Sequence, residues 1–303
     1  MNICIRAQIE YEKILPDNCE LSLLCTRSRM SLQYLLDSHN HDHLKQRLID
    51  HISLSDKMLN YVIQNPTMML NFQPTFEWSI DNKIIQTPCW RVENILPRIL
   101  LTRIITQDYQ EQLQNGSYKE SSKQLSQLIS YHEQIKHELQ LWRWKNDVLQ
   151  HDELQTDWHE SRVLYLEGLK HLCTLCVGLD RNVGTNTLFV LTQKALKSFA
   201  CSVATWRTSE AGQLLPVVEC LRHYFSADLL WSQAKYGGSI YRLKTWCSVS
   251  NLDFGAFHIL QTTIENVPFL LNERIKLNNS VYYEPVESTE PLLTPIDLIT
   301  ASA

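Results

Sequence analysis

The chain has 303 residues, of which 44 % are hydrophobic and 20 % are charged. This balance is typical of a folded protein with a substantial core and excludes a largely disordered one. The net charge of −5 does not favour binding to nucleic acid. Because no stretch of about 20 consecutive apolar residues is present, the sequence predicts no membrane-spanning helix.

The cysteine and glycine contents further restrict the location and the fold class that the sequence predicts. The first ten residues lack the apolar core of a signal peptide, so a cytoplasmic location is expected. The nine cysteines are then expected to be reduced thiols, and their odd number argues against a disulfide framework. Average usage would give roughly 20 glycines, but the chain has eight. Glycine-rich phosphate loops are therefore hard to accommodate, and a helical protein with short connections is favoured.

The N-terminal third is predicted to contain two helices and a hairpin. Residues 1–20 have no clear pattern. Apolar residues at intervals of three and four predict helices over residues 21–36 and 42–64. The alternating, β-branched and aromatic segments 75–80 and 83–87, separated by Asp81-Asn82, predict a β-hairpin near residues 75–87.

Helices dominate the rest of the chain. They are predicted over residues 89–113, 117–149, 156–177, 185–207, 210–235, 239–250 and 254–277. Pro97 should kink or break the first of them. Successive helices joined by short turns predict an all-α, tetratricopeptide-like solenoid of antiparallel hairpins, in a single domain of residues 1–303. The proline-containing tail, residues 280–303, is expected to be extended and to pack back on the domain through its apolar residues.

One histidine-rich segment has the composition of a metal site. His39, His41, Asp42 and His43 offer imidazole and carboxylate ligands of the kind that zinc prefers. A zinc-dependent hydrolase is therefore one alternative, but the spacing and the low glycine content do not match the known hydrolase motif. The favoured interpretation is a polar loop that caps the following helix.

Other motifs give no support for catalysis. Cys173 and Cys176 have the spacing of a redox or zinc half-site, but no second pair is present. Both lie within an apolar helical stripe, so we expect them to be buried thiols. No Walker loop, dinucleotide fingerprint or nucleophile elbow is present. We therefore expect a non-enzyme with no catalytic residue, cofactor or metal.

Several segments, in chain order, resemble the Bro-one (BRO) domain family, whose members include Alix and Brox. Residues 235–243 are similar to its helix–turn–helix signature, in which a Lys, a Gly two residues later and Ile-x-Arg-Leu recur. Here Gly237 is expected to take a positive φ at the helix end. Residues 278–286 resemble the closing motif of the family, and Phe76-Glu77-Trp78 resembles the start of its hairpin. Residues 25–37 are similar to an early helix of Brox, the member to which the resemblance is greatest.

The resemblance implies a boomerang-shaped adaptor domain that binds the C-terminal amphipathic helix of ESCRT-III charged multivesicular body proteins. Its role would lie in endosomal sorting and membrane remodelling, with recruitment to endosomal or nuclear-envelope membranes through ESCRT. The apolar patch that receives the helix in the family corresponds here to Leu169, Leu172, Cys173, Cys176, Leu188 and Leu191. Two alternatives remain: these residues pack one helix pair together, or the chain is a helical scaffold for an unrelated peptide. Thr300 stands where Brox-type proteins carry the cysteine of a prenylation box, so no lipid anchor is expected.

Overall fold

The computed structural model describes most of the chain. The described residues are 3–5, 11, 19–37, 43–65, 75–81, 83–87, 89–141, 151–207, 209–246 and 252–286. They fall into two compact units: unit 1 contains Met1–Gln107 and Ser130–His159, and unit 2 contains Asp108–Ile129 and Glu160–Ala303. Among the described helices, none is long and apolar enough to cross a membrane.

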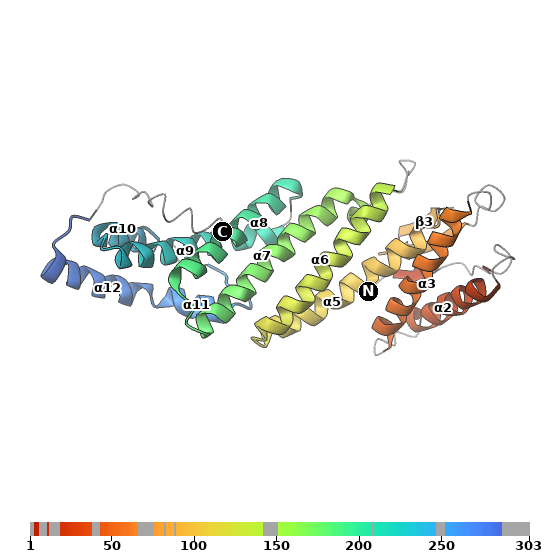
Figure 1. Ribbon diagram of the computed structural model, residues 1–303, viewed down its shortest axis with the longest axis horizontal. Coiled ribbons are helices and arrows are strands. Elements are labelled where there is room, and N and C mark those ends of the chain that lie inside the picture. The colour runs from red at the N-terminus through yellow and green to blue at the C-terminus, as the bar shows by residue number, and fades with distance from the viewer. Residues whose placement is uncertain are drawn as a thin grey trace. The chain divides into compact units, whose positions relative to one another are not determined.

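Helices make up most of both units, and a small sheet belongs to unit 1 (Figure 1). The elements of unit 1 are β1 (Ile3–Ile5), α2 (Cys19–Asp37), α3 (Leu44–Gln64), β2 (Phe76–Ile80), β3 (Lys83–Thr87) and the 3-10 turn η3 (Asp152–Leu154). Three helices contribute residues to both units: α5 (Val92–Gln114), α6 (Tyr118–Leu141) and α7 (Thr156–Asp180). Unit 2 continues with α8 (Thr185–Thr205), α9 (Ser209–Ser232), α10 (Tyr236–Trp246), α11 (His258–Glu265), α12 (Val267–Leu277) and the π-helical turn η4 (Asn278–Tyr282).

The predicted hairpin is confirmed, and a third strand extends it. The three strands are antiparallel in the order β1-β2-β3, with Trp78 opposite Ile85 on one side and Ile5 on the other. The additional strand β1 comes from the N-terminal residues that have no clear sequence pattern. Three residues are too few to show an alternation, so this strand is specified by its pairing with β2 rather than by its own sequence.

Unit 1 is built around a buried carboxylate. Glu93 of α5 is 4 % exposed, and its oxygens accept hydrogen bonds from the Tyr11 hydroxyl at 2.8 Å, Arg29 Nε at 3.2 Å and Trp78 Nε1 at 2.5 Å. The Arg29 guanidinium also lies 5.5 Å from the centroid of the Trp78 ring. A charge can be buried at this depth only because it is paired and hydrogen-bonded. The cluster thereby joins α2, the sheet and α5.

Unit 2 is a succession of packed helices, and α8, α9 and α10 lie side by side in it (Figure 1). Helices α7 and α8 approach closely because α7 carries a glycine at the contact: a Cβ on Gly168 would lie 2.5 Å from the ring of Phe199. The buried hydroxyls of Ser161 and Ser202 are 2.9 Å apart, and each donates to the backbone carbonyl of the other residue. Small residues therefore set the spacing of this helix pair.

Two details differ from the sequence prediction. The helix predicted over 254–277 is two helices that meet at Asn266, because Pro268 at the start of α12 lacks the N–H that a continuous helix needs. The tail begins later than residue 280, because η4 continues the helix to Tyr282. Of the two outcomes expected at Pro97, a kink or a break, the break does not occur, since α5 runs through this residue.

The turn between α9 and α10 also differs. Gly237 does not take a positive φ; the left-handed residue is Ala234, with φ 60°, and Gly237 lies in the first turn of α10. The helix predicted over 117–149 is confirmed as far as Leu141, and residues 142–150 lie outside the described residues.

Candidate partner-binding site

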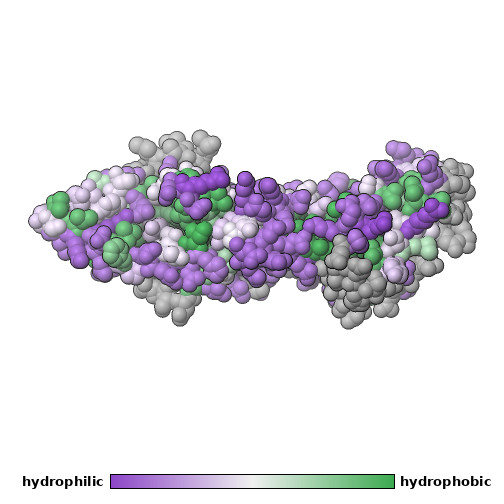
Figure 2. All heavy atoms as spheres, turned by 90° about the horizontal axis from the view of Figure 1, so that it is seen from below, coloured by the Kyte–Doolittle hydropathy of each residue, from purple (hydrophilic) through white to green (hydrophobic). Residues whose placement is uncertain are grey.

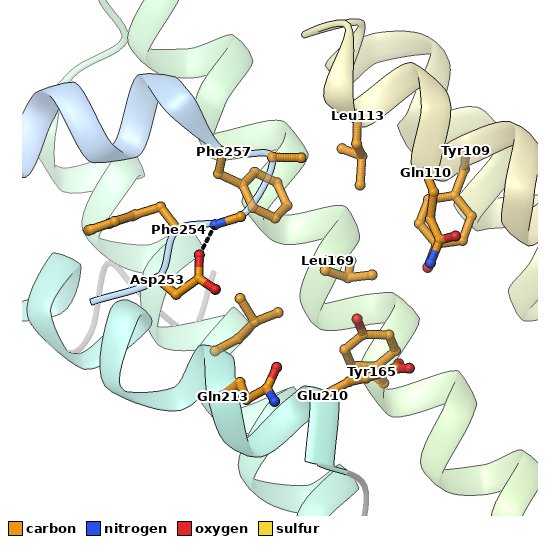
Figure 3. A pocket seen from close by; sticks show the side chains of 13 residues that line it. Tyr109, Gln110, Leu113, Tyr165, Leu169, Glu210, Gln213, Asp253, Phe254 and Phe257 are labelled. Carbon is orange, nitrogen blue, oxygen red and sulfur yellow. Dashed lines mark hydrogen bonds between the residues drawn. The ribbon is translucent and has the colours of Figure 1, made fainter. Parts of the chain in front are cut away.

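The main candidate site is a pocket in unit 2 with a volume of about 200 Å³. Helices α5, α7 and α9 and the turn before α11 surround it (Figure 3). The pocket is lined by Tyr109, Gln110, Leu113, Tyr165, Leu169, Glu210, Gln213, Leu214 and residues 253–257. Its volume is below the roughly 300–1,000 Å³ of sites for drug-sized ligands, so it suits one or two side chains of a bound peptide better than a cofactor.

The floor of the pocket is apolar and comes from three different elements. Leu113, Leu169 and Phe257 converge on the space from α5, α7 and the turn before α11 (Figure 3), and each is at most 5 % exposed. The ring of Phe257 stacks on Tyr118 with the ring centroids 6.1 Å apart, and the Tyr118 hydroxyl donates to the carbonyl of Ala256. The turn is thereby held in place, and the floor is formed before any partner binds.

The rim of the pocket is polar. Gln110 and Gln213 are exposed, and Asp253 Oδ1 accepts a hydrogen bond from the backbone N–H of Gly255 at 2.8 Å. Glu210 is paired with Arg162 at 2.6 Å. An apolar floor with a polar rim is the usual anatomy of a peptide-binding site, because the floor provides affinity and the rim provides orientation.

Two tyrosines on the wall keep their protons at neutral pH. Burial raises the pKa of Tyr109 to about 12. Burial also raises the pKa of Tyr165, with a smaller contribution from the neighbouring Tyr109. Both side chains therefore line the pocket as neutral phenols, and the Tyr165 hydroxyl is hydrogen-bonded to the Glu210 carboxylate.

The residues predicted to bind the partner lie on two helices. Leu169, Leu172, Cys173 and Cys176 are on α7, and Leu188 and Leu191 are on α8. Five of the six are at most 5 % exposed, and Leu191 is half-buried. Leu188 packs so closely on α7 that its side chain would lie 2.9 Å from a Cβ at Gly178. Of these six residues, Leu169 lines the pocket. A direct role in partner binding stays a prediction for all six residues.

Most of the pocket could not be found from the sequence. Tyr109, Glu210 and residues 253–257 are far apart in the chain and have no shared motif. The one local signal is a pair of aromatic residues, Phe254 and Phe257, close to Gly255. Both are buried in the structure, which is unusual for residues of a turn. Elsewhere, on the face in Figure 2, apolar side chains gather in separate small patches rather than in one continuous band.

The cysteine pair behaves as expected for core residues. Cys173 and Cys176 are both fully buried free thiols. Burial raises the pKa of Cys173 to about 12 and that of Cys176 further still. A redox-active or metal-binding cysteine needs the opposite shift, because the thiolate is the reactive form.

The histidine-rich segment gives no site within the described residues. His43 is exposed at the start of α3, and His39, His41 and Asp42 lie outside the described residues. Asp81, His151 and Glu153 form a different group in unit 1, with ligand atoms within 4.8 Å of one another. The guanidinium of Arg103 already pairs with both carboxylates, at 2.7 and 2.5 Å, and its hydrogen bonds lower the pKa of Asp81. The two carboxylates of this group are therefore already paired with a positive charge of the protein.

Comparisons with known proteins identify the fold through structure rather than sequence. No family model matches the chain, and neither does any curated protein. A structure described as the ALIX BRO1 CHMP4C complex superimposes with a TM-score of 0.75 at 13 % identity, covering 97 % of this chain and 91 % of the other. A structure of a Bro1 domain described in terms of endosomal targeting has a TM-score of 0.70 at 13 % identity, covering 95 % and 87 %.

A third structure, ALIX in complex with the SIVmac239 PYKEVTEDL late domain, has a TM-score of 0.74 at 11 % identity. It covers 96 % of this chain and 46 % of the longer ALIX chain. Agreement over nearly the whole chain at such low identity shows a shared arrangement of the helices. The chain therefore has the fold of a Bro1 domain, as the sequence resemblance implies.

Proposed function

We propose that this chain is a non-catalytic adaptor that binds the C-terminal amphipathic helix of an ESCRT-III charged multivesicular body protein. Its fold is that of the BRO1 domain of ALIX, which has been solved in a complex with CHMP4C. Such an adaptor would be recruited to endosomal or nuclear-envelope membranes through its ESCRT partner. The observation that carries the proposal is this fold together with a preformed apolar pocket of side-chain size.

The binding mode would be a helix in a groove. An amphipathic helix presents apolar side chains at positions i, i+3 and i+4, and one or two of them would enter the pocket above Leu169. Polar residues on either side of these anchors would meet Gln110 and Gln213 at the rim. Leu191, the accessible member of the predicted α8 residues, offers an alternative contact surface.

Fluorescence anisotropy with a labelled peptide of the CHMP4C C-terminal helix tests the proposal. Leu214 lines the pocket but is half-buried, so Leu214→Glu places a charge at the site without removing a core residue. Leu191→Glu makes the same change on α8. Ile63→Glu is the control, because Ile63 is 49 % exposed on α3 in unit 1. Leu188 is unsuitable as a test position, because at 5 % exposure a charge there would disturb the core.

We expect saturable binding in the micromolar range that Leu214→Glu abolishes and that Ile63→Glu leaves unchanged. Loss of binding with Leu191→Glu alone would move the site to α8 and keep the function. Absence of binding up to about 1 mM, equivalent to about 4 kcal/mol, would overturn the proposed partner. The alternative, a scaffold for an unrelated peptide, would then be tested by a partner screen with Leu214→Glu as the negative control.

A further inference from the structure

Helices α7 and α8 pack antiparallel, and three close contacts fix their register. The contacting pairs are Ser161–Ser202, Gly168–Phe199 and Gly178–Leu188. Between the two glycine contacts, α7 advances by ten residues while α8 runs back by eleven. By this register, residues 170–172 of α7 lie opposite residues 194–197 of α8.

This stretch brings together basic side chains from both helices. Lys170 and His171 on α7 are half-buried, and Lys194 and Lys197 on α8 are exposed. The two α8 lysines are three residues apart and therefore lie on the same side of their helix. Burial lowers the pKa of His171, and the positive charges of Lys194 and Lys170 lower it further. These four residues form what we call the cationic strip.

Acidic side chains do not balance the cationic strip. Helix α8 contains two lysines and no Asp or Glu, and α7 contains no Asp or Glu between Glu167 and Asp180. Asp180 is ten residues beyond Lys170, about 15 Å along the helix and further than the screening length of about 8 Å. Within the part of the chain that the structure describes, none of the four basic side chains forms an ion pair. Three lysines therefore stand against the single carboxylate of Glu167.

The other segments of unit 2 that surround α7 do not shift the pKa of His171. Their charged and titratable side chains are Asp108 and Glu111 on α5, Lys119, Glu120 and Lys123 on α6, Glu210, Glu219, Arg222, His223 and Asp228 on α9, and Asp253 before α11. None of these groups contributes to the shift, and neither does Glu167. The protonation of His171 therefore depends on its burial, on Lys170 and Lys194, and on any charge that binds beside them.

An apolar side chain lies beside the cationic strip. Leu191 is half-buried and precedes Lys194 by three residues, about 4.5 Å along α8. On an amphipathic helix, an apolar and a charged side chain three or four residues apart are separated by a similar distance. A partner helix that lies along α8 can therefore place an apolar side chain on Leu191 and a charged one on the cationic strip.

We propose that the cationic strip binds an acidic side chain of an amphipathic partner helix, whose apolar residue one turn away packs on Leu191. A carboxylate placed near Lys170, His171 and Lys194 can accept charge-assisted hydrogen bonds from them. Because the whole chain carries a net charge of −5, this attraction belongs to the strip and not to the chain as a whole. The inference rests on the proposed function for the helical form of the partner, and it adds the charge that the partner must carry.

Binding is linked to the protonation of His171. A bound carboxylate favours the charged imidazolium and so raises the pKa that Lys194 and Lys170 lower in the free protein. The complex therefore takes up a proton, and the affinity is highest below both pKa values and falls as the pH rises through them. A rise of one pKa unit on binding would make the affinity at low pH up to about tenfold higher than at high pH.

Fluorescence anisotropy with two designed peptides and the full chain tests the proposal. Both peptides are labelled, alanine-based helices with leucines at positions i, i+3, i+4 and i+7; one carries Glu and the other Lys on both sides of this stripe. We expect the Glu peptide to bind at least about tenfold more tightly than the Lys peptide, a difference of about 1.4 kcal/mol. Lys194→Glu should weaken binding of the Glu peptide by at least about tenfold. Lys276→Glu makes the same change at an exposed residue of α12 and should leave the binding unchanged.

His171→Gln tests the proton linkage separately from the attraction to the lysines. The wild type should bind the Glu peptide between about threefold and tenfold more tightly near pH 5.5 than near pH 7.5, and His171→Gln should bind it equally at both. The peptide glutamates remain ionised over this range, since their pKa is about 4.3. A merely structural role of His171 would weaken binding at both pH values and leave their ratio unchanged. In the wild type, the NMR-measured pKa of the His171 ring should rise when the Glu peptide is added.

Several outcomes would overturn the inference. They are no binding of the Glu peptide up to about 1 mM, equal binding of the two peptides, equal binding by the wild type and Lys194→Glu, and a pH dependence that persists in His171→Gln. Binding to vesicles of phosphatidylserine and phosphatidylcholine that requires Lys194, without binding of the Glu peptide, would assign the strip to a membrane surface instead.

The CHMP4C peptide separates this inference from the proposed function. If it binds the wild type and Lys194→Glu equally, the proposed function stands and this inference fails. If the Glu peptide binds through Lys194 and the CHMP4C peptide does not bind, the partner is a different acidic helix and this inference stands.

Discussion

At the scale of single residues, Glu93 carries an unusually large share of the organisation of unit 1. It is almost fully buried and accepts hydrogen bonds from a tyrosine, an arginine and a tryptophan that come from three separate segments. Its charge raises the pKa of Tyr11 beyond the effect of burial alone. Arg29 is 2 % exposed, so its ion pair with this carboxylate helps to offset the cost of burying the guanidinium.

We therefore expect Glu93→Gln to destabilise unit 1 severely. The substitution keeps the size of the side chain but removes the negative charge that pairs with the buried Arg29, and breaking a buried ion pair in this way costs about 3–5 kcal/mol. Urea unfolding followed by circular dichroism measures the loss. Glu133→Gln, at an exposed position on α6, is the matched control and should change the stability by at most about 0.5 kcal/mol. Equal stability of the two variants would show that the carboxylate does not hold this core.

At the scale of secondary-structure elements, the helices were largely predictable because their apolar spacing is local. Helix α3 was predicted over 42–64 and spans Leu44–Gln64, since its buried residues recur with the helical period. Strand β1 was not predictable, because three residues have no period and its partner β2 is more than 70 residues away. The same limit applies to the pocket, whose walls come from three helices and a turn.

The resemblance to a family pointed to particular residues, but it did not predict whether their side chains are buried or exposed. Leu172, Cys173 and Cys176 were predicted as a patch, and the structure places them at 0 % exposure. An apolar helical stripe has the same sequence pattern whether another helix of the same chain or a partner covers it. The sequence likewise predicted that position 237 requires a glycine, but the predicted reason, a positive φ, was wrong. The glycine provides room for the backbone of Pro285 rather than a left-handed turn.

This reassignment gives opposite predictions for two helical glycines. Gly237→Ala would force the Pro285 carbonyl away from α10, an overlap with backbone that should destabilise unit 2 by about 1–3 kcal/mol. A Cβ at Gly212 in α9 meets nothing within 4 Å, so Gly212→Ala should stabilise the protein by about 0.5 kcal/mol through helix propensity. Thermal unfolding of both variants measures the difference in sign. A stable Gly237→Ala would contradict the close approach of residues 283–286 to α10.

At the scale of the whole molecule, the reactivity of individual cysteines can be used to follow the unfolding of each unit separately. Cys25 lies in unit 1, whereas Cys173, Cys176 and Cys220 lie in unit 2, and the side chains of all four are buried. Cys201 on α8 is exposed. Burial raises the pKa of Cys25 and of Cys173 to about 12, so both are almost entirely thiols at neutral pH. Since the thiolate is the reactive form, burial protects them sterically and chemically.

Alkylation with iodoacetamide, followed by peptide mass spectrometry, should therefore give a wide range of rates from one sample. We expect Cys201 to react in the native protein at nearly the rate of a free thiol. Cys173 and Cys176 should react with the same urea dependence, because both lie on the buried face of α7 and one opening event exposes them. Cys25 should follow the unfolding of unit 1, so Glu93→Gln should move its midpoint to lower urea. Rapid native labelling of Cys173 or Cys176 would instead mean that the α7 interior opens under native conditions, and the pocket floor built on it would not be preformed.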